Sequence, residues 1–523
     1  MHAMSEPDVV EDLHARATRI RDEMGGAERV ARMNAEGDKT VREHIDAFLD
    51  PGSFRELGTF SHSMRLEDRD KTPGDGKIGG HGLADGRPVV VFGDDITVRR
   101  GSSSLVGSRK EVRLYQRAVE MGVPIVHFGE TGGARIPDIM GAEGISEGGE
   151  LFPAFSTRRH RVPMATAIVG QSFGGSSFLS ALSDFVVMVR GSCLAVTSPR
   201  VFEVATGEVI TFEDLGGVDV HADQTGQIDL GVDTDAQAYA AIRQWLSYLP
   251  PNNSAPPPRA EPADRGTLEA DPELAGLVPE RRTRGYDMRR VVARIADAGS
   301  VFELQPRYAR NISCSLARLD GWPVAFVANN PMFSAGVLDP KACHKIIRLV
   351  TVCDAYQVPV IFLIDVPGFM VGRRVEHERI LHWGMRLMQA LHLCSVPTLT
   401  VCLRKAFGLA WQAMNGAGQA ALGLYVWPGA EIGFMDPDVG VNVAYGSKLA
   451  ALADTSEREQ ERRRLAGEVA EATSPYEAAG VLRVDEVIDP AQTRLVLAED
   501  LATLANRPLP PPESRTLACW PSC

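Results

Sequence analysis

The amino-acid sequence predicts an α/β protein made of two tandem domains related by internal duplication. The chain has 523 residues, which is too long for one typical domain. It repeats itself on the two sides of a central linker, at a spacing of 235 positions in the first part of each copy and 234 afterwards. The matched pairs are Gly86 and Gly321, Lys110 and Lys345, Pro124 and Pro359, then Pro163 and Pro397, Phe173 and Phe407, and Gly174 and Gly408.

Both copies have the same order of elements: a strand, a glycine-bearing loop, a helix, a second strand and a third strand. The strands are continuous apolar runs rather than alternating ones, which indicates burial on both faces of a sheet. Helices of about ten to fifteen residues separate the strands, and together these features predict an α/β architecture of repeated β-β-α turns. The expected strands are 88–92, 123–129 and 165–169 in the first copy and 323–329, 358–365 and 398–403 in the second.

The linker lies between Tyr248 and Arg284, where proline, asparagine and charged residues dominate. Such a composition cannot bury enough apolar surface to hold a core, so the domain boundary is expected there. The expected organisation is an N-terminal helical extension at 1–36, a first domain at 37–250, a linker at 251–284, a second domain at 285–510 and a tail at 511–523.

The composition is that of an ordinary soluble globular protein, with 44% hydrophobic and 24% charged residues. A formal charge of −13 disfavours nonspecific attraction to nucleic acid or to anionic membranes. The N-terminus lacks an apolar signal core and no apolar run reaches the roughly 18 residues of a membrane span, so a cytoplasmic protein is expected. The eight cysteines include no C-x-x-C pair, and the spacing of Cys519 and Cys523 fits a loose tail, so no metal is expected in this chain.

Two glycine-bearing turns recur at strand ends, which is where ligands bind in α/β folds. TGGAR (131–135) in the first copy corresponds to IDVPGFMVG (364–372) in the second, and GQSFGGSS (170–177) corresponds to RKAFGLAW (404–411). Small residues at a strand-to-helix turn let backbone N–H groups approach a ligand, and the helix dipole adds positive potential. Such a turn can stabilise an oxyanion by several kcal/mol. The alternative is that the glycines serve only the tight packing of helix on strand.

Ser172 raises a second alternative, because Gly170, Ser172 and Gly174 fit the G-x-S-x-G pattern of a serine hydrolase. A nucleophile supported by the duplicated scaffold would have its counterpart at position 406, which is Ala406. The hydroxyl is not repeated whereas the glycine is, and no acid and histidine are marked by spacing as its partners. The pattern therefore favours chemistry by the backbone.

A set of ordered motifs resembles the carboxyltransferase (beta) subunit of biotin-dependent acyl-CoA carboxylases, including the propionyl-CoA, acetyl-CoA and methylcrotonyl-CoA carboxylases. The resemblance covers residues 37 to 500, and so many motifs in order are far more specific than any glycine turn alone. The motifs are GDKTVREHIDAFLDPGSFRELG, PGDGKIGGHG, TGGARI, ATGEVITFEDLGGVDVH, LSYLPPNN, YARNISCSLARLDGWPVAFVANNP, AGVLD, CDAYQVPVIFLIDVPGFMVG, RKAFGLAWQAM and VIDPAQTR.

The resemblance implies two crotonase-type domains, each a ββα superhelix of the ClpP/crotonase kind. It also implies a homodimer as the working unit, commonly gathered into a hexamer, and a partner subunit that carries biotin carboxylase and the biotin carboxyl carrier. The implied cofactor is biotin on that partner, and the implied substrate is an acyl-CoA. The chain shows no Ala-Met-Lys-Met segment for biotinylation, so carboxybiotin is expected to arrive from outside.

The implied reaction moves CO₂ from N1 of carboxybiotin to the α-carbon of an acyl-CoA. Negative charge develops on the thioester oxygen and on the ureido oxygen of biotin, so two oxyanion holes suit the task. By motif, the thioester hole falls on the N–H groups of Gly174 and Gly175, and the biotin-side hole falls on Leu409 and Ala410. The residues implied to line the two ligands are Gly132, Gly133, Ala134 and Arg135 for acyl-CoA, and Gly408, Trp411 and Gln412 around biotin and the acyl chain.

Several details stay open. Thr131 stands where the family usually has Ser, and Leu409 replaces a glycine of the common RKAYGGAY, so the Leu409 side chain must point away from biotin. Arg135 either meets a phosphate of CoA or caps its own helix. Lys110 and Lys345 are expected on the solvated faces of equivalent helices. Two other functions compete: a biotin-independent acyl-CoA decarboxylase or crotonase-like enzyme, and a noncatalytic assembly subunit.

Overall fold

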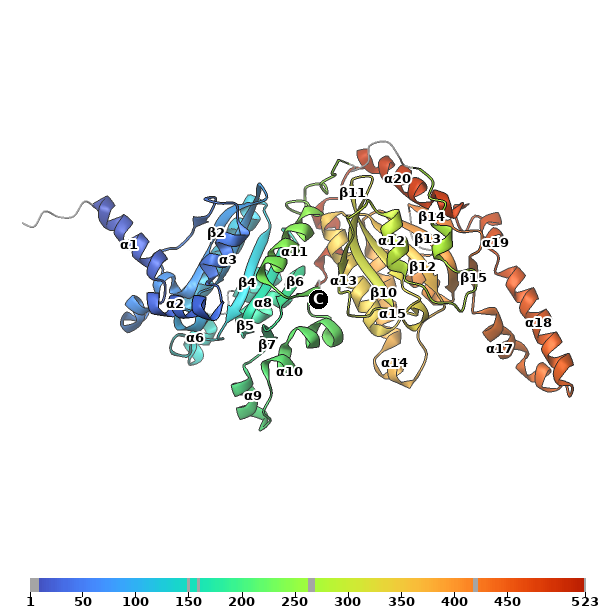
Figure 1. Ribbon diagram of the computed structural model, residues 1–523, viewed down its shortest axis with the longest axis horizontal. Coiled ribbons are helices and arrows are strands. Elements are labelled where there is room, and N and C mark those ends of the chain that lie inside the picture. The colour runs from blue at the N-terminus through green and yellow to red at the C-terminus, as the bar shows by residue number, and fades with distance from the viewer. Residues whose placement is uncertain (1–8, 148–150, 158–159, 262–268, 417–421, 522–523) are drawn as a thin grey trace, which may run out of the picture. The chain divides into compact units, whose positions relative to one another are not determined.

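The structure is a computed structural model that describes residues 9–147, 151–157, 160–261, 269–416 and 422–521. The chain divides into two compact units (Figure 1). Unit 1 contains the described residues up to Ser247 together with Pro251–Asn253, and unit 2 contains Tyr248–Pro250 and the described residues from Ser254 on. Among these residues, no helix is both long and apolar enough to cross a membrane.

Each unit is built on one mixed sheet, and the two sheets have the same topology. In unit 1 the order is β1-β2-β3-β4-β5-β6-β8 with β7 paired to β5, and in unit 2 it is β9-β10-β11-β12-β13-β14-β16 with β15 paired to β13. In both, the first three strands pair antiparallel and the later ones parallel. The central strands are β3 (Arg87–Asp94), β4 (Ile125–Thr131), β5 (Met164–Phe173), β11 (Trp322–Asn329), β12 (Val360–Val366) and β13 (Thr398–Phe407).

The remaining strands are shorter or lie toward the edges of the two sheets. They are β1 (Arg55–Glu56), β2 (Lys77–Ala84), β6 (Phe185–Val189), β7 (Cys193–Ala195), β8 (Leu230–Val232), β9 (Phe302–Leu304), β10 (Ile312–Leu319), β14 (Gly423–Val426), β15 (Glu431–Gly433) and β16 (Glu486–Val487). The small strands β7 and β15 pair with the carboxyl-terminal ends of β5 and β13, so they flank the two turns that the sequence singles out.

Helices cover both faces of each sheet, as expected for strands that are buried on both sides. In unit 1, α3 and α11 pack on one face and α4 and α8 on the other. In unit 2, α12 packs on β10 and β11, while α13 packs on the same strands and against α15. The helices up to the linker are α1 (Val9–Glu23), α2 (Ala27–Glu36), α3 (Val41–Phe48), α4 (Leu105–Met121), α5 (Ile136–Ile139), α6 (Ala142–Glu147), α7 (Leu151–Ser156), α8 (Gly175–Ala181), α9 (Pro199–Thr206), α10 (Phe212–Gly216) and α11 (Asp235–Ser247).

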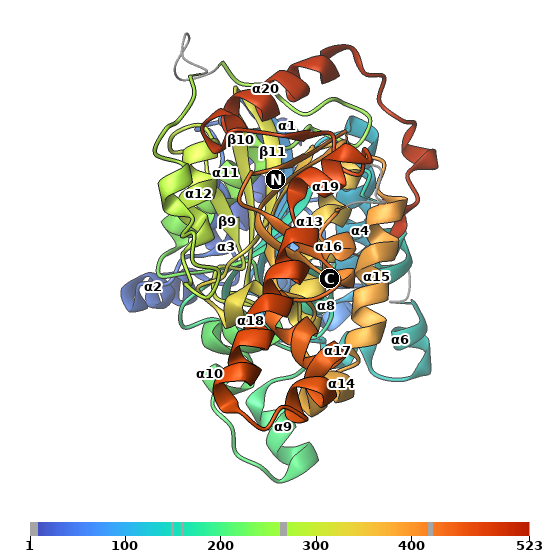
Figure 2. The same ribbon diagram turned by 90° about the vertical axis from the view of Figure 1, so that its right-hand side faces the viewer.

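Unit 2 adds a helical pair, α17 and α18, that packs together (Figure 2) and extends away from the sheet (Figure 1). A small apolar cluster joins the two helices through Val441, Leu449 and Leu465. The helices of unit 2 are α12 (Met288–Ile295), α13 (Pro340–Tyr356), α14 (Arg373–His377), α15 (Ile380–Leu393), α16 (Leu409–Ala413), α17 (Pro437–Ala450), α18 (Thr455–Ala472), α19 (Pro475–Gly480) and α20 (Thr493–Thr503).

The predicted duplication is confirmed at the level of strand register. His127 lies opposite Thr166 in unit 1, and Phe362 lies opposite Thr400 in unit 2. Corresponding residues are 235 positions apart on the second strand of each unit and 234 positions apart on the third. The second unit is therefore one residue shorter in the connection between those two strands. Since this difference falls outside the sheet, it leaves strand pairing unchanged, and the two units can be compared residue by residue.

The expectation that Lys110 and Lys345 are solvated is wrong. Both side chains are buried, with 5% and 1% exposure. The Lys345 ammonium donates to the carbonyl oxygens of Gln305, Tyr308 and Ile312 at 2.8–2.9 Å. Lys110 likewise donates to the Lys77 carbonyl at 2.6 Å. Each buried ammonium group therefore donates hydrogen bonds to backbone carbonyl oxygens. Such bonds are how a buried charge is tolerated.

Candidate functional site

The two turns aligned by the duplication have the same backbone conformation. Gly174 has φ 68° and ψ −136°, and Gly408 has φ 63° and ψ −154°. This region is accessible almost only to glycine. The Gly174 N–H donates to the Val196 oxygen at 3.1 Å, and the Gly408 N–H donates to the Gly433 oxygen at 2.9 Å. In both units the glycine thus anchors the turn to the chain at the end of the small flanking strand.

The N–H groups of the next two residues in each turn are not hydrogen-bonded in the way that the glycine N–H is. They belong to Gly175 and Ser176 at the start of α8, and to Leu409 and Ala410 at the start of α16. These positions open a helix, so they have no acceptor within it. None of the four donates a backbone hydrogen bond to any described residue. Each unit therefore presents two adjacent donors at the positive end of a short helix dipole.

The structure brings the TGGAR turn against the Gly174 turn. A Cβ placed on Gly174 would lie 3.4 Å from the Gly133 Cα, which is ordinary van der Waals contact, and 3.9 Å from the Ala134 nitrogen. The turn is held by its own backbone, because Gly132 donates to the Arg100 oxygen and Ser103 donates to the Gly133 oxygen, both at 2.8 Å. Ala134 stays exposed, and its N–H donates to no acceptor in the described part of the chain.

The same arrangement recurs in unit 2. A parallel bridge joins Ser103 to Ala134 in unit 1 and Leu338 to Phe369 in unit 2, each 235 positions later. The Leu338 N–H donates to the Gly368 oxygen at 3.1 Å, as Ser103 does to Gly133. Both expected turns therefore form in both units, although only unit 1 has two glycines in the first of them.

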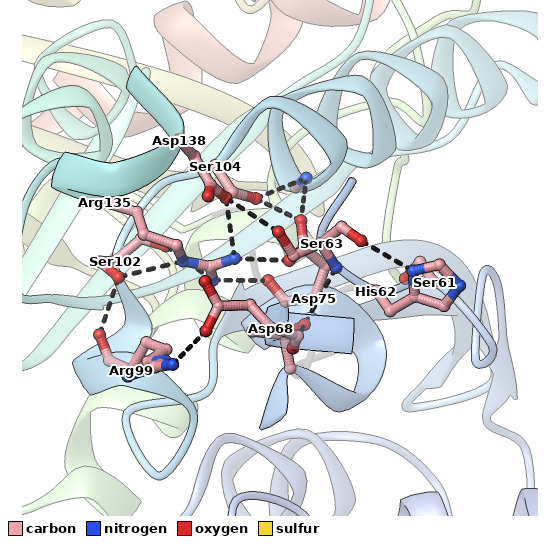
Figure 3. Close-up of polar contacts among 12 residues, drawn as sticks. Ser61, His62, Ser63, Asp68, Asp75, Arg99, Ser102, Ser104, Arg135 and Asp138 are labelled. Carbon is pink, nitrogen blue, oxygen red and sulfur yellow. Dashed lines mark hydrogen bonds and ion pairs between the residues drawn. The ribbon is translucent and has the colours of Figure 1, made fainter. Parts of the chain in front are cut away.

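Arg135 lies at the centre of a buried polar network (Figure 3). Its guanidinium is 4% exposed and pairs with Asp75 at 2.5 Å and with Asp138 at 3.3 Å. It also donates to the carbonyl oxygens of Asp75 and Ser102, and the Ser104 hydroxyl donates to the same Asp75 carboxylate. The side chain thereby ties the TGGAR turn to two other loops.

Ser172 is fully buried in β5, and its hydroxyl contacts only the Ser177 hydroxyl, at 3.3 Å, among the described side chains. The nearest serine–histidine pair is instead Ser176 and His127, at 3.2 Å. Burial lowers the pKa of His127 to about 3, so the ring is neutral. A buried serine with no histidine beside it cannot act as a hydrolase nucleophile, so that alternative is wrong.

The residues beside the Gly408 turn differ in exposure. The Leu409 side chain is 50% exposed, whereas the Trp411 side chain is 7% exposed. Gln412 lies on the exposed side of α16. The turn thus presents an apolar side chain, an amide and two free N–H groups together, a mixture typical of a small-molecule site.

Sequence reasoning did not single out Ser176 as a donor. The signal was available, because subtracting 234 from Leu409 and Ala410 gives Gly175 and Ser176 rather than Gly174 and Gly175. The donors were assigned to Gly174 and Gly175 because they are two adjacent glycines. A glycine indicates the backbone conformation of a turn and does not indicate which N–H group is free. Among the described residues, no three His, Cys, Asp or Glu side chains are grouped so as to hold a metal ion.

Comparison with known proteins agrees with this geometry. The carboxyl transferase domain family matches residues 32–517. A propionyl-CoA carboxylase carboxyltransferase subunit from Haloferax mediterranei is 39% identical, over 94% of this chain and 95% of that protein. The methylmalonyl-CoA carboxyltransferase 12S subunit of Propionibacterium freudenreichii is 35% identical over 92% of each chain. The methylmalonyl-CoA decarboxylase alpha subunit of Veillonella parvula is 34% identical, over 95% and 96%.

Solved structures point the same way. The crystal structure of transcarboxylase 12S, described as a hexamer with methylmalonyl-coenzyme A bound, superposes with a TM-score of 0.91. The match covers 98% of each chain at 34% sequence identity. The expected crotonase-type fold, with two duplicated α/β domains, is thereby confirmed. The chain belongs to the carboxyl transferase family, as a carboxyltransferase subunit of the acyl-CoA carboxylase type.

Proposed function

We propose that this subunit transfers CO₂ from N1-carboxybiotin to the α-carbon of an acyl-CoA, with unit 1 binding the thioester and unit 2 binding biotin. The observation that carries the proposal is the pair of matched turns, each with two free N–H groups behind a glycine whose own N–H is used. A reaction in which charge appears on two separate oxygens needs two such sets of N–H donors. A fold present twice in one chain supplies them.

On the thioester side, the donors are Gly175 and Ser176, and Ala134 adds a third N–H from the neighbouring turn. Gly174 keeps the glycine conformation but gives its own N–H to Val196, so its role is to shape the turn. Gly132 and Gly133 let the TGGAR backbone lie close to the ligand. The enolate that forms when the α-proton leaves is stabilised by these fixed dipoles, which need no reorganisation as charge develops.

On the biotin side, the donors are Leu409 and Ala410, with Gly408 shaping the turn. The free N–H groups suit a ureido oxygen, and the half-exposed Leu409 side chain leaves them accessible. When bound, biotin supplies the activated CO₂ and its N1 accepts the proton taken from the acyl-CoA. The protein then needs no general base, which agrees with the buried and neutral state of His127 beside Ser176 in unit 1. Trp411 and Gln412 flank this turn and help to set acyl preference.

Arg135 acts through the turn rather than through a ligand. All the contacts that place its guanidinium are internal, to Asp75, Ser102 and Asp138. A guanidinium committed in this way is not available to a phosphate of CoA without breaking a buried ion pair, which costs several kcal/mol. We therefore assign Arg135 a positioning role for Gly133 and Ala134.

The biotin itself is carried by a partner subunit that contains biotin carboxylase and the biotin carboxyl carrier. The working unit is a homodimer that assembles into a hexamer in the cytoplasm. The hexameric assembly of the 12S relative supports this part of the proposal. The relatives named as carboxyltransferase or beta subunits support the division of labour between chains.

The proposal is tested with the purified chain and carboxylated acyl-CoA esters. With free biotin present, the chain should convert methylmalonyl-CoA or malonyl-CoA to the decarboxylated ester, and without biotin it should not. Supplied only with ATP, bicarbonate and propionyl-CoA, the isolated chain should be inactive. Activity under that last condition would contradict the need for a partner.

A second function, an acyl-CoA decarboxylase, is favoured by one observation, and its independence from biotin is a separate question for the experiment. A relative at 34% identity is named methylmalonyl-CoA decarboxylase subunit alpha. Release of CO₂ from methylmalonyl-CoA at the same rate with and without biotin would support it. Failure to bind any acyl-CoA would instead favour a noncatalytic assembly subunit.

A further inference from the structure

Unit 1 contains a cavity of about 860 Å³ at the carboxyl ends of β4, β5 and β6. It is lined by side chains of α3 and α11, by the chain at 37–39 and by the strand ends. Its size is that of a small-molecule site, since such pockets measure roughly 300–1,000 Å³. Glu130, Gly170 and Arg200 are among the residues in its wall.

Glu130 is the unusual group in this wall. Its carboxyl packs directly over Gly170, where a Cβ would come within 2.2 Å of the Glu130 Oε1. No side chain pairs with the Glu130 carboxyl among the described residues. Two cations that line the cavity pair with other carboxylates, because Lys39 lies 2.7 Å from Asp235 and Arg190 lies 3.2 Å from Asp233.

The duplication shows what this carboxyl lacks. In unit 2, Asp365 stands 235 positions after Glu130, and Arg404 stands 234 after Gly170. Asp365 is fully buried, and Arg404 contacts its Oδ2 through Nη2 at 2.8 Å and through Nε at 3.0 Å. The Lys405 ammonium lies 3.3 Å from Oδ1. Unit 1 has Gly170 and Gln171 at the two cationic positions.

The surroundings of the Arg404 guanidinium are also repeated. Its Nη1 donates to the carbonyl oxygens of Pro279, Arg281 and Arg284, and its plane lies 5.0 Å from the Tyr286 ring. The segment that contains these three carbonyl groups precedes α12 in the chain. Residues 37–39, which line the cavity, precede α3 in the same way. Unit 1 therefore has a carboxyl group and a loop that correspond to those around Arg404, but no arginine.

The missing cation has an electrostatic consequence. Burial, together with the carboxylates of Asp38, Asp94 and Asp235, raises the pKa of Glu130 to about 8. A cation at this place would favour the ionised form of Glu130. At the rim, Arg100 and Arg200 line the same cavity, and neither makes an ion pair with a described residue.

We propose that the cavity of unit 1 binds a small organic molecule that carries a guanidinium or primary ammonium group at one end and a carboxylate at the other, as arginine does. The cationic end sits on Glu130 in the place that Arg404 occupies in unit 2. The carboxylate faces Arg100 and Arg200. A guanidinium suits the part of the cavity around Glu130 because it is planar and can donate to a carboxylate and to carbonyl oxygens at the same time. This site is lined by α3 and α11 and does not include Gly175 or Ser176, and it borders the proposed acyl-CoA site at Gly132 of the TGGAR turn.

Calorimetry and thermal unfolding of the full chain test the proposal with four probes: arginine, agmatine, acetyl-arginine amide and propionate. Arginine should bind and raise the unfolding temperature, agmatine should bind more weakly because it lacks the carboxylate, and propionate should not bind. Acetyl-arginine amide imitates an arginine side chain of a polypeptide. Binding of this capped compound in preference to arginine would overturn the assignment to a small free ligand.

Two variants make the result specific. Glu130→Gln keeps the shape and removes the charge, and it should weaken arginine binding about tenfold or more, as expected for a charge-assisted contact. The double variant Glu130→Asp with Gly170→Arg copies the unit 2 pair into unit 1, and it should abolish binding while raising the unfolding temperature. If wild type and Glu130→Gln bind arginine equally, or if arginine does not bind the wild type, the proposal is wrong.

Discussion

Gly174 and Gly408, 234 residues apart, share one backbone conformation and one hydrogen-bond role. Each has a φ between 60° and 70°, and each gives its N–H to an oxygen at the end of the small strand beside it. The donors left free are then the next two residues of each turn. This relationship moves the proposed thioester donors by one residue, from Gly174 and Gly175 to Gly175 and Ser176. It also makes the two turns separately testable.

Replacing Gly175 by proline should remove one thioester donor without breaking α8. Proline is tolerated at the first position of a helix, and its only loss there is the N–H group. We expect kcat for transfer from methylmalonyl-CoA to biotin to fall by about 10²- to 10³-fold. Gly175→Ala is the matched control, since its Cβ would meet only the Ser103 hydroxyl at 3.8 Å. Equal activity of the two variants would show that this N–H carries no catalysis.

Leu409→Pro should do the same on the biotin side. Leu409 opens α16 as Gly175 opens α8, so the fold should again tolerate the ring. We expect a similar loss of kcat, with the acyl-CoA dissociation constant unchanged because the donors of unit 1 remain. Leu409→Ala, which keeps the N–H, should stay near wild-type kcat. A weakened acyl-CoA affinity in Leu409→Pro would argue against the separation of the two sites.

Arg135→Lys should lower the stability of the protein, because Arg135 holds the TGGAR turn in place and does not bind a phosphate of CoA. The lysine cannot reproduce the contacts to Asp75, Asp138 and Ser102, and a broken buried ion pair costs about 3–5 kcal/mol. We expect a lower unfolding temperature and a reduced kcat. If Arg135 instead bound a phosphate of CoA, KM would rise while the unfolding temperature stayed unchanged. Steady-state kinetics and calorimetry on the same sample separate the two outcomes.

His127 should make unit 1 sensitive to acid. Its folded pKa is about 3 against 6.5 for an ordinary histidine, so the unfolded chain binds more protons between these values. Stability is then full above pH 6.5 and declines as pH falls toward 3, by up to about 1.4 kcal/mol per pH unit. The double variant His127→Phe with Ser176→Ala copies Phe362 and Ala410 of unit 2. Its unfolding free energy should fall less steeply below pH 6.5, measured in urea at several pH values.

The slope of that double variant is the informative quantity. Burial also lowers the pKa of His44, to about 4, but His44 is present in both proteins and its contribution cancels in the difference. Ser176→Ala alone should retain the steep wild-type slope. An unchanged slope in the double variant would mean that His127 does not carry the acid sensitivity.

Lys345→Met should destabilise unit 2 strongly. The substitution leaves the carbonyl oxygens of Gln305, Tyr308 and Ile312 without their donor, at about 1–3 kcal/mol for each unsatisfied buried group that water does not reach. Lys71→Met, at an exposed position, is the control and should change the unfolding free energy by less than about 0.5 kcal/mol. Urea unfolding followed by tryptophan fluorescence measures both. A Lys345→Met protein as stable as the control would mean that the lysine is dispensable.

The strands, the duplication and the places of the turns can all be predicted from the amino-acid sequence. Continuous apolar runs such as 358–364, bounded by turn residues, favour strands in the middle of a covered sheet. Positions such as Gly174 and Gly408 have a backbone conformation that other residues rarely adopt. These are local properties, carried by a few neighbouring residues, and they can be read without knowing what the chain later packs against.

Which polar groups are hydrogen-bonded within the protein and which are free depends on how the chain folds. Lys110 and Lys345 look like surface residues until carbonyl oxygens from distant loops surround them, and Arg135 looks like a ligand contact until Asp75 meets it from 60 positions earlier. Whether the N–H of Gly174 or of Ser176 is available depends on where the Val196 oxygen lies. Hydrogen-bond and ion-pair partners come from segments far apart in sequence, so their pairing exists only after the chain has folded.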